Sequence, residues 1–315
     1  MTIEESKIDP VPLISVLMPC YNHEEYVLSS LESVAASDYK FIEFIFIDDA
    51  SKDNSFNLAK KWFKKNKDRF ARTMCIQHEK NRGICATFNE LYTLSHGEYI
   101  SYLASDDLLL VNAISKQTRF ALNNGVDFVF SDCMLIDESE KLISDSGLQY
   151  FGKNAQMLDN RVCLAAEIIF FWGVPWYKFF MKSALVKKIG LFDENLCFED
   201  RDFIIRVLIN GSFKFMPNVT TAYRIRFKNR ITPGLVREDI INDFRKADCK
   251  NYLNSKGVIR FLLGIVVYCY EERYRELEIK NFAFISHFSR ILRLLMRSII
   301  KFHRLVHHFF RRVWN

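Results

Sequence analysis

Pairs of carboxylates end two apolar stretches of this sequence. Asp48 and Asp49 follow one stretch, and Asp106 and Asp107 follow another. Two adjacent anions repel each other unless a cation or solvent lies between them. Ser105 and the two aspartates after it could instead cap the next helix, because Ser and Asp are preferred N-cap residues. Each pair therefore indicates either a turn or a metal site.

The segments around these pairs predict how they are positioned. Apolar runs of strand length alternate with segments of helical periodicity. Pro19 is expected to end the first strand, because proline cannot continue a central ladder. This order predicts an α/β fold with a doubly wound, mostly parallel sheet. The expected strands cover residues 14–18, 41–47, 72–77, 98–102 and 126–130, and the expected helices lie near 25–36, 53–62, 83–94 and 111–122.

In such a sheet, ligands bind outside the carboxyl ends of the strands. Tyr21 and Asn22 follow the first strand and should join both carboxylate pairs at this edge. The sequence has no glycine-rich phosphate loop of the dehydrogenase or P-loop type. Carboxylates therefore suggest Mg²⁺ or Mn²⁺ bridging to a diphosphate. Tyr21 and Asp49 could stack on and hydrogen-bond a base, although Tyr21 could equally be a packed aromatic residue.

Several short motifs occur in a fixed order along the chain. They are Pro19-Cys20-Tyr21-Asn22, Ile47-Asp48-Asp49-Ala50-Ser51-Lys52-Asp53, Asn81-Arg82-Gly83, Gly97-Glu98-Tyr99-Ile100, Ser105-Asp106-Asp107, Gly190-Leu191-Phe192-Asp193-Glu194 and Phe198-Glu199-Asp200-Arg201-Asp202-Phe203 with Arg206. Together they resemble the motifs of family 2 glycosyltransferases with the GT-A fold, over about residues 13–230. The resemblance implies an inverting enzyme that uses a nucleotide sugar, most often a UDP-sugar.

The resemblance also implies roles for individual residues. It places the metal on Asp106 and Asp107, and the catalytic base at Asp200 beside Glu199. It also implies that Asp49 binds the nucleoside, and we add Pro19, Tyr21, Asn22, Gly83 and Arg226 as candidates for binding the nucleotide donor. The chemistry agrees, because an attacking hydroxyl must lose its proton and a divalent cation can stabilise a diphosphate leaving group. Glu199 and Asp200 could also be an ordinary acidic helix start.

The sequence departs from the family pattern at two positions. Ala104 stands where many members have Asp, so the full DxD motif is shortened to Ser-Asp-Asp. Arg226 stands where members often have a His that could contact the metal. We expect Arg226 near the diphosphate, because guanidinium groups complement phosphate. The alternative is an exposed Arg on an edge strand.

By elimination, we expect residues 160–181 to form the acceptor-binding region. Trp172 and Trp176 lie in a dense aromatic run and are the candidates for stacking on a sugar. Such a run could also be core or lipid-adjacent packing.

The C-terminal part differs in charge from the rest. The net charge is +6, and residues 281–315 contain seven Lys or Arg and no acidic residue. A near-neutral body does not suggest nucleic-acid binding. We expect a transferase domain at 1–235 and a helical extension at 236–315, whose residues 285–315 form a basic amphipathic helix on an anionic membrane surface. The helix could instead dock on the protein's own body or form a dimer.

Other features concern the cell compartment. The eight cysteines are scattered without a CxxC pair, which favours free thiols in a reducing compartment. The polar N-terminus predicts no signal peptide, and no uncharged apolar run approaches the roughly 18–20 residues of a membrane span. These features predict a cytoplasmic protein, peripheral on the inner face of the membrane.

The function expected from these features is a metal-dependent hexosyl- or N-acetylhexosaminyltransferase. It would move a sugar from a nucleotide diphosphate to a glycan or lipid-linked glycan, as a possible homo-oligomer. A catalytically silent nucleotide-binding subunit of a glycan-assembly complex is the alternative, because the DxD motif is eroded. A nucleotidyltransferase would be expected to have a glycine-rich first loop, which is absent.

Overall fold

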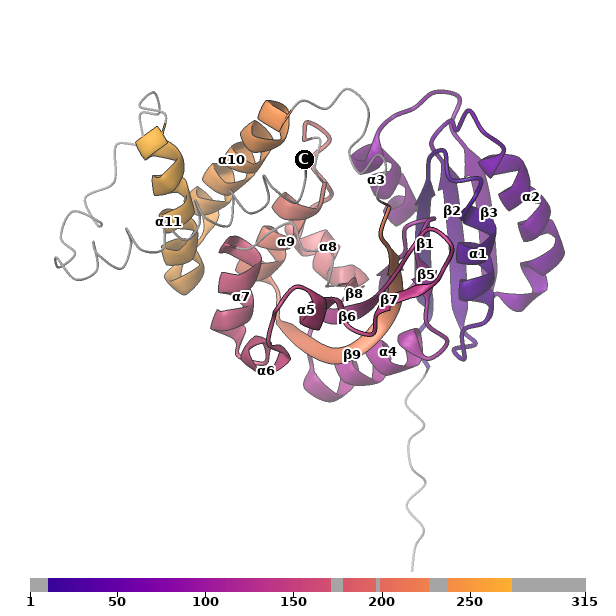
Figure 1. The fold of residues 1–315 in the computed structure, drawn as a ribbon, viewed down its shortest axis with the longest axis horizontal. Coiled ribbons are helices and arrows are strands. Elements are labelled where there is room, and N and C mark those ends of the chain that lie inside the picture. The colour runs from indigo at the N-terminus through magenta and orange to yellow at the C-terminus, as the bar shows by residue number, and fades with distance from the viewer. Residues whose placement is uncertain (1–10, 171–177, 197–198, 227–236, 274–315) are drawn as a thin grey trace, which may run out of the picture.

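The computed structural model describes residues 11–170, 178–196, 199–226 and 237–273. A nine-stranded mixed sheet runs through it, flanked by helices (Figure 1). The strands are β1 (Ile14–Cys20), β2 (Ile42–Asp48), β3 (Arg72–Gln77), β4 (Tyr99–Tyr102), β5 (Leu108–Leu109), β6 (Phe128–Ile136), β7 (Leu142–Ser144), β8 (Lys178–Lys182) and β9 (Phe213–Arg224).

The helices fall into an N-terminal and a C-terminal group. The first group is α1 (Val27–Ala35), α2 (Ser55–Asn66), a 3₁₀ turn (Lys67–Arg69), α3 (Ile84–Leu94) and α4 (Ala113–Asn124). The second is α5 (Gly147–Tyr150), α6 (Ala155–Leu158), α7 (Arg161–Phe170), α8 (Ser183–Ile189), α9 (Glu199–Asn210), α10 (Arg237–Asn254) and α11 (Gly257–Arg273). No helix in the described ranges is both long and apolar enough to cross a membrane.

The strand order β3-β2-β1-β4-β8-β6-β9-β5 has two parts. Strands β1 to β4 pair in parallel, which confirms the predicted α/β fold with its mostly parallel sheet. Strand β8 then pairs antiparallel with both β4 and β6, while β9 runs parallel to β6. The register of β6 against β9 shifts on both sides of Asp132, so β9 carries extra residues there.

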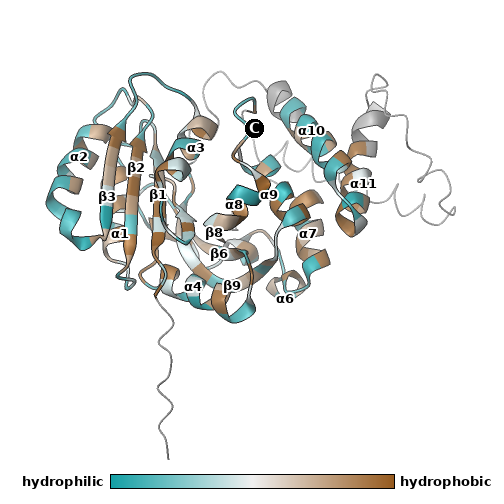
Figure 2. Cartoon of the chain, turned by 180° about the vertical axis from the view of Figure 1, so that it is seen from behind, coloured by the Kyte–Doolittle hydropathy of each residue, from teal (hydrophilic) through white to brown (hydrophobic). Residues whose placement is uncertain are grey.

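Helices cover both faces of the sheet. Side chains alternate between these two faces along every strand. Phe44 and Phe46 of β2 pack with α1, α2 and α4, whereas Ile45 and Ile47 belong to the core that includes α3, α7 and α9. Figure 2 shows apolar strands between helices whose outer faces are polar. This layering explains why the first strands read as continuous apolar runs.

Pro19 does not end β1, contrary to the sequence expectation. The strand continues to Cys20 and pairs with β2 throughout. Leu17 accepts a hydrogen bond from the backbone of Leu103 on the β4 side, and Pro19 faces the same side two residues later. Because β4 pairs with β1 only as far as Leu17, no ladder bond is lost at the proline.

The described part of the predicted C-terminal extension packs on the rest of the chain. Helix α11 contributes Leu263 and Val266 to the core that also contains α7. Helix α10 is bound to α9 by a buried ion pair, in which Arg201 Nε and Nη2 lie 2.9 and 2.8 Å from the two carboxylate oxygens of Asp248. The side chains of this pair are 3% and 0% exposed.

We predict that Asp248→Ala lowers the free energy of unfolding by about 3–5 kcal/mol, because it removes the carboxylate that neutralises the buried Arg201 charge. Urea denaturation measures this loss. The double variant Arg201→Met with Asp248→Leu is the control and should recover most of it. A loss below about 1 kcal/mol in Asp248→Ala would show that the ion pair does not hold α10 on α9.

Candidate active site

Asp49 organises the turn that precedes α3. It follows β2, and its backbone N–H donates to the Cys20 carbonyl at 2.8 Å. Its Oδ1 accepts from the Arg82 backbone N–H at 2.8 Å and its Oδ2 from that of Gly83 at 2.9 Å. His78 Nδ1 lies 2.6 Å from Oδ1. Gly83 has φ +84°, which favours glycine, so this predicted residue serves the backbone geometry of the turn.

The turn after β1 is bound to the turn after β2. Asn22 adopts φ +55°, and its backbone N–H donates to Ser51 Oγ at 2.9 Å. Its side-chain oxygen accepts from the Lys52 backbone N–H at 2.8 Å. Tyr21 is 38% exposed, so its ring is not a packed core aromatic, and Pro19 is buried. Tyr21 can therefore present its side chain to a base.

Asp106 faces two nitrogenous side chains from distant parts of the chain. Its Oδ2 lies 2.9 Å from Arg226 Nη2 and 3.9 Å from His23 Nε2. Arg226 Nη1 is 3.2 Å from the same His23 nitrogen, and His23 Nδ1 is 2.8 Å from Ser105 Oγ. Burial lowers the pKa of His23, against the opposing effect of Asp106. The predicted residues Asp106 and Arg226 therefore meet in the structure.

Asp107 points away from Asp106 and is enclosed. Its Oδ2 accepts from Lys178 Nζ at 2.6 Å, and its Oδ1 from the Arg224 backbone N–H at 3.0 Å. Burial raises the pKa of Asp107 against the opposing effect of Lys178. Burial also opposes the charge of Lys178, but Asp107, Cys133 and Tyr223 together raise the pKa of Lys178. The Arg224 guanidinium donates to the Asp106 carbonyl at 2.8 Å, which fixes the end of β9 on this turn.

A divalent cation shared by Asp106 and Asp107 does not fit this arrangement. Such a cation needs carboxylate oxygens at about 2.0–2.1 Å. Both oxygens of Asp107 accept hydrogen bonds from the protein, and Asp106 Oδ2 is paired with Arg226. Within the described ranges, no group of three or more His, Cys, Asp or Glu side chains could hold a metal ion. The Ser-Asp-Asp turn does not cap the next helix either, because the N-cap of α4 is Asn112.

Asp200 lies in the first turn of α9. Burial raises the pKa of Asp200 to about 6, although the Arg201 backbone N–H opposes the rise. Its buried Oδ1 has no hydrogen-bond partner within the residues that the structure describes. A carboxylate with a pKa near neutrality and an unsatisfied oxygen can accept a proton from a hydroxyl.

Helix α3 connects the Asp49 turn to the loop before Asp200. Asn89 of α3 accepts from the Phe192 backbone N–H at 2.8 Å and donates to the Phe192 carbonyl at 3.0 Å. The Phe192 ring stacks on Phe203 of α9 at 4.3 Å between centroids. The Asp49 turn and the loop before Asp200 are therefore both attached to α3.

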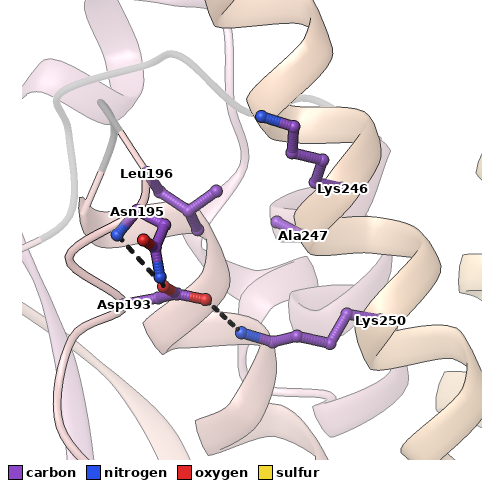
Figure 3. A pocket seen from close by; sticks show the side chains of 6 residues that line it. All are labelled: Asp193, Asn195, Leu196, Lys246, Ala247 and Lys250. Atoms are coloured by element: carbon purple, nitrogen blue, oxygen red, sulfur yellow. Dashed lines mark hydrogen bonds and ion pairs between the residues drawn. The ribbon is translucent and has the colours of Figure 1, made fainter.

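A hollow of about 310 Å³ lies between this loop and α10 (Figure 3). Lys250 of α10 points across it, with Nζ 2.8 Å from Asp193 Oδ2. The hydrogen bond from Lys250 lowers the pKa of Asp193 to about 2. None of the predicted nucleotide or metal residues lines this hollow. It is therefore separate from the strand-end site, by which we mean the turns that carry Tyr21, Asp49 and Asp106.

Some predicted residues lie outside the described part of the chain. These are the acceptor candidates Trp172 and Trp176, the side chain of Glu199, and the basic tail 285–315. Their assignments stay predictions.

Sequence reasoning missed two contributors to the site. His23 follows β1 just as Asp49 follows β2, so the strand-end rule could have selected it. Lys178 gives no such signal, because its partner Asp107 is 71 positions away and the strand that carries it was not predicted.

Residues 15–172 match the family model described as Glycosyl transferase family 2. An uncharacterized glycosyltransferase of Rickettsia typhi is 29% identical over 218 residues, which cover 68% of this chain and 64% of that protein. The Escherichia coli protein WfaP, a UDP-Glc:α-D-GlcNAc-diphosphoundecaprenol β-1,3-glucosyltransferase, is 30% identical over 120 residues, 38% of this chain and 45% of that protein. This chain thus spans less than two thirds of either relative.

Solved structures share the fold at low sequence identity. S. aureus TarS residues 1–349, in complex with UDP-GlcNAc, superposes with a TM-score of 0.63 at 19% identity, covering 85% of this chain and 77% of that one. The mannosyltransferase PcManGT from Pyrobaculum calidifontis, in complex with GDP-Man and Mn²⁺, gives a TM-score of 0.55 at 12% identity, covering 93% and 86%.

Proposed function

Because the chain belongs to glycosyl transferase family 2, we propose that it transfers a sugar from a nucleoside diphosphate to a glycan acceptor with inversion at the anomeric carbon. The observation that carries the proposal is Asp200, whose pKa burial raises to about 6 at the start of α9. A structural carboxylate in a helix start would be expected to have its oxygens hydrogen-bonded, whereas the buried Oδ1 of Asp200 has no partner in the described residues.

In the proposed reaction, Asp200 removes the proton of the acceptor hydroxyl as that oxygen attacks the anomeric carbon. The bond from the anomeric carbon to the diphosphate breaks, and its electron pair stays on the diphosphate oxygen. Arg226 lies at the strand-end site with its side chain 30% exposed, where its guanidinium can hydrogen-bond phosphate oxygens. Loop and helix contacts through Asn89 support the placement of Asp200 relative to the nucleotide turn.

A UDP-sugar is the proposed donor. The family match and the UDP-linked donors of WfaP and TarS support this choice. Tyr21 is exposed beside Asn22 and can stack on the base, and Asp49 holds the turn at Gly83. Transfer of a hexosyl or an N-acetylhexosaminyl group is equally compatible with these residues.

We predict that Asp200→Asn lowers turnover by about 10²- to 10⁴-fold, because the amide cannot accept the hydroxyl proton. Nucleotide affinity should stay unchanged. Sugar transfer with the donor identified by the binding experiment below measures the loss. Asp68→Asn, at an exposed position, is the matched control. A catalytically silent subunit has no turnover to lose, so undetectable turnover in the wild type would favour that alternative.

The pH dependence provides a second check on Asp200. Its raised pKa means that the base becomes protonated below about pH 6. We therefore expect kcat/KM to fall about tenfold per pH unit below that value. The residual activity of Asp200→Asn should lack this acidic limb, and a limb retained unchanged in the variant would assign it to another group.

We predict that UDP raises the thermal unfolding temperature more than GDP, dTDP or CMP does. A ligand that binds the folded state at 100 times its Kd stabilises by roughly 2.7 kcal/mol. Tyr21→Ala should reduce the shift without changing the unfolding temperature of the free protein, because the ring is exposed. The absence of a shift with all four nucleotides would contradict the proposed donor class.

A lipid-linked glycan at the inner face of the membrane is the proposed acceptor. The basic sequence of residues 285–315 and the diphosphoundecaprenol acceptor of WfaP support it. We predict that anionic vesicles sediment the full chain and that deletion of 285–315 abolishes sedimentation, with zwitterionic vesicles as the control. Equal sedimentation of both proteins would remove the role of this segment.

A further inference from the structure

One oxygen of the expected metal motif is already bound to a cation. Asp106 Oδ2 lies 2.9 Å from Arg226 Nη2, within the range of a charge-assisted hydrogen bond. The Asp106 side chain is 13% exposed and that of Arg226 is 30% exposed, so the pair is shielded more on the carboxylate side. A divalent cation on the same oxygen would meet the positive guanidinium at close range, and the two would repel each other.

Arg226 is held by several groups. Besides Asp106, His23 Nε2 lies 3.2 Å from its Nη1. The Tyr26 ring centroid lies 5.9 Å from its guanidinium carbon and 4.7 Å from that of Arg224. Arginine suits such a position, because its planar fork is always charged and can contact a carboxylate, an aromatic ring and a phosphate in different directions. The guanidinium is therefore positioned before any ligand binds.

The second carboxylate of the motif cannot compensate. Lys178 Nζ and the Arg224 backbone N–H occupy the two oxygens of Asp107, whose side chain is 2% exposed. Opening Asp107 to a metal would leave Lys178 without its buried partner and release the end of β9. Of the two carboxylates, Asp106 is the more exposed, and its Oδ2 is bound to Arg226.

We propose that the Arg226 guanidinium, held on Asp106, takes the place of a divalent cation at the diphosphate, so that this protein binds its nucleotide donor independently of metal. The inference rests on the proposed function. When the bond from the anomeric carbon to the diphosphate oxygen breaks, the electron pair remains on that oxygen and the added negative charge faces Arg226. Asp106 is then a positioning residue for Arg226, and Lys178 is the counter-ion that keeps Asp107 closed.

The experiment is calorimetric titration of the full-length protein with UDP, GDP and dTDP, in EDTA and then in Mn²⁺. With the nucleotide that binds most tightly, wild-type Kd should change less than about threefold between the two buffers. Arg226→Ala should weaken binding in EDTA by roughly 10- to 150-fold, because hydrogen bonds to charged groups contribute about 1.5–3 kcal/mol. The Kd of Arg226→Lys should lie between those of the wild type and Arg226→Ala, because lysine keeps the positive charge but lacks the planar guanidinium group.

Controls separate a phosphate contact from general damage. Arg119 is exposed on α4, and Arg119→Ala should bind like the wild type. The affinity for uridine, which lacks phosphate, should be unchanged in Arg226→Ala. Asp106→Asn should weaken nucleotide binding equally in EDTA and in Mn²⁺, as a positioning residue does.

Two results would overturn the inference and are distinguishable. If Mn²⁺ tightens binding to the wild type tenfold or more and Asp106→Asn removes that gain, Asp106 is a metal ligand and the proposed function stands. If no nucleotide binds in either buffer, the proposed function fails and the inference fails with it.

Discussion

The buried Asp107 carboxylate is the contact on which the strand-end site depends. It lies in the turn between β4 and β5, and it binds Lys178 at the start of β8 and the backbone of Arg224 at the end of β9. Three strands that are distant in sequence are thereby fixed at one edge of the sheet. Burying the Asp107 carboxylate without a partner is unfavourable. Lys178 offsets this cost, so the structure depends on the pair. The backbone of Asp106 is fixed in the same turn, because its carbonyl accepts a hydrogen bond from Arg224.

Arg224 and Arg226 lie near the end of β9 and have different roles, because only Arg224 belongs to the strand. Arg224 is 2% exposed and donates to the carbonyls of Asp106, Asp137 and Glu138, so it fastens the strand to neighbouring turns. Arg226 follows two residues later, beyond the last strand residue, and reaches the Asp106 carboxylate. The anchoring of the first arginine restricts where the second can lie, which is the preorganisation that electrostatic stabilisation of a leaving group needs.

The sequence predicted the parallel half of the fold well and the remainder poorly, for physical reasons. Strands β1, β2 and β4 are buried along their whole length and appear as apolar runs. Together with the half-buried β3, they lie within two residues of their predicted bounds. Strand β9 contains Pro217 and Asn218, which interrupt its pattern, and β8 has five residues. The strand order accounts for the adjacency of the turns after β1, β2 and β4, which hydrogen bonds from Asn22 to Ser51 and between His23 and Ser105 connect. The pairing of Asp106 with Arg226 and of Asp107 with Lys178 depends on tertiary geometry that no local pattern encodes.

The register shift beside Asp132 has a consequence for protein engineering. Extra residues in β9 at this bulge set where its second half lies against β6, and that half ends at Arg224. The position of both arginines is therefore determined jointly by β6 and β9 and not by β9 alone. A chimera that exchanges this edge of the sheet between related proteins must transplant the two strands with their bulge as one module. A graft of the C-terminal strand by itself would misalign its arginines by whole residues, even if every side chain matched.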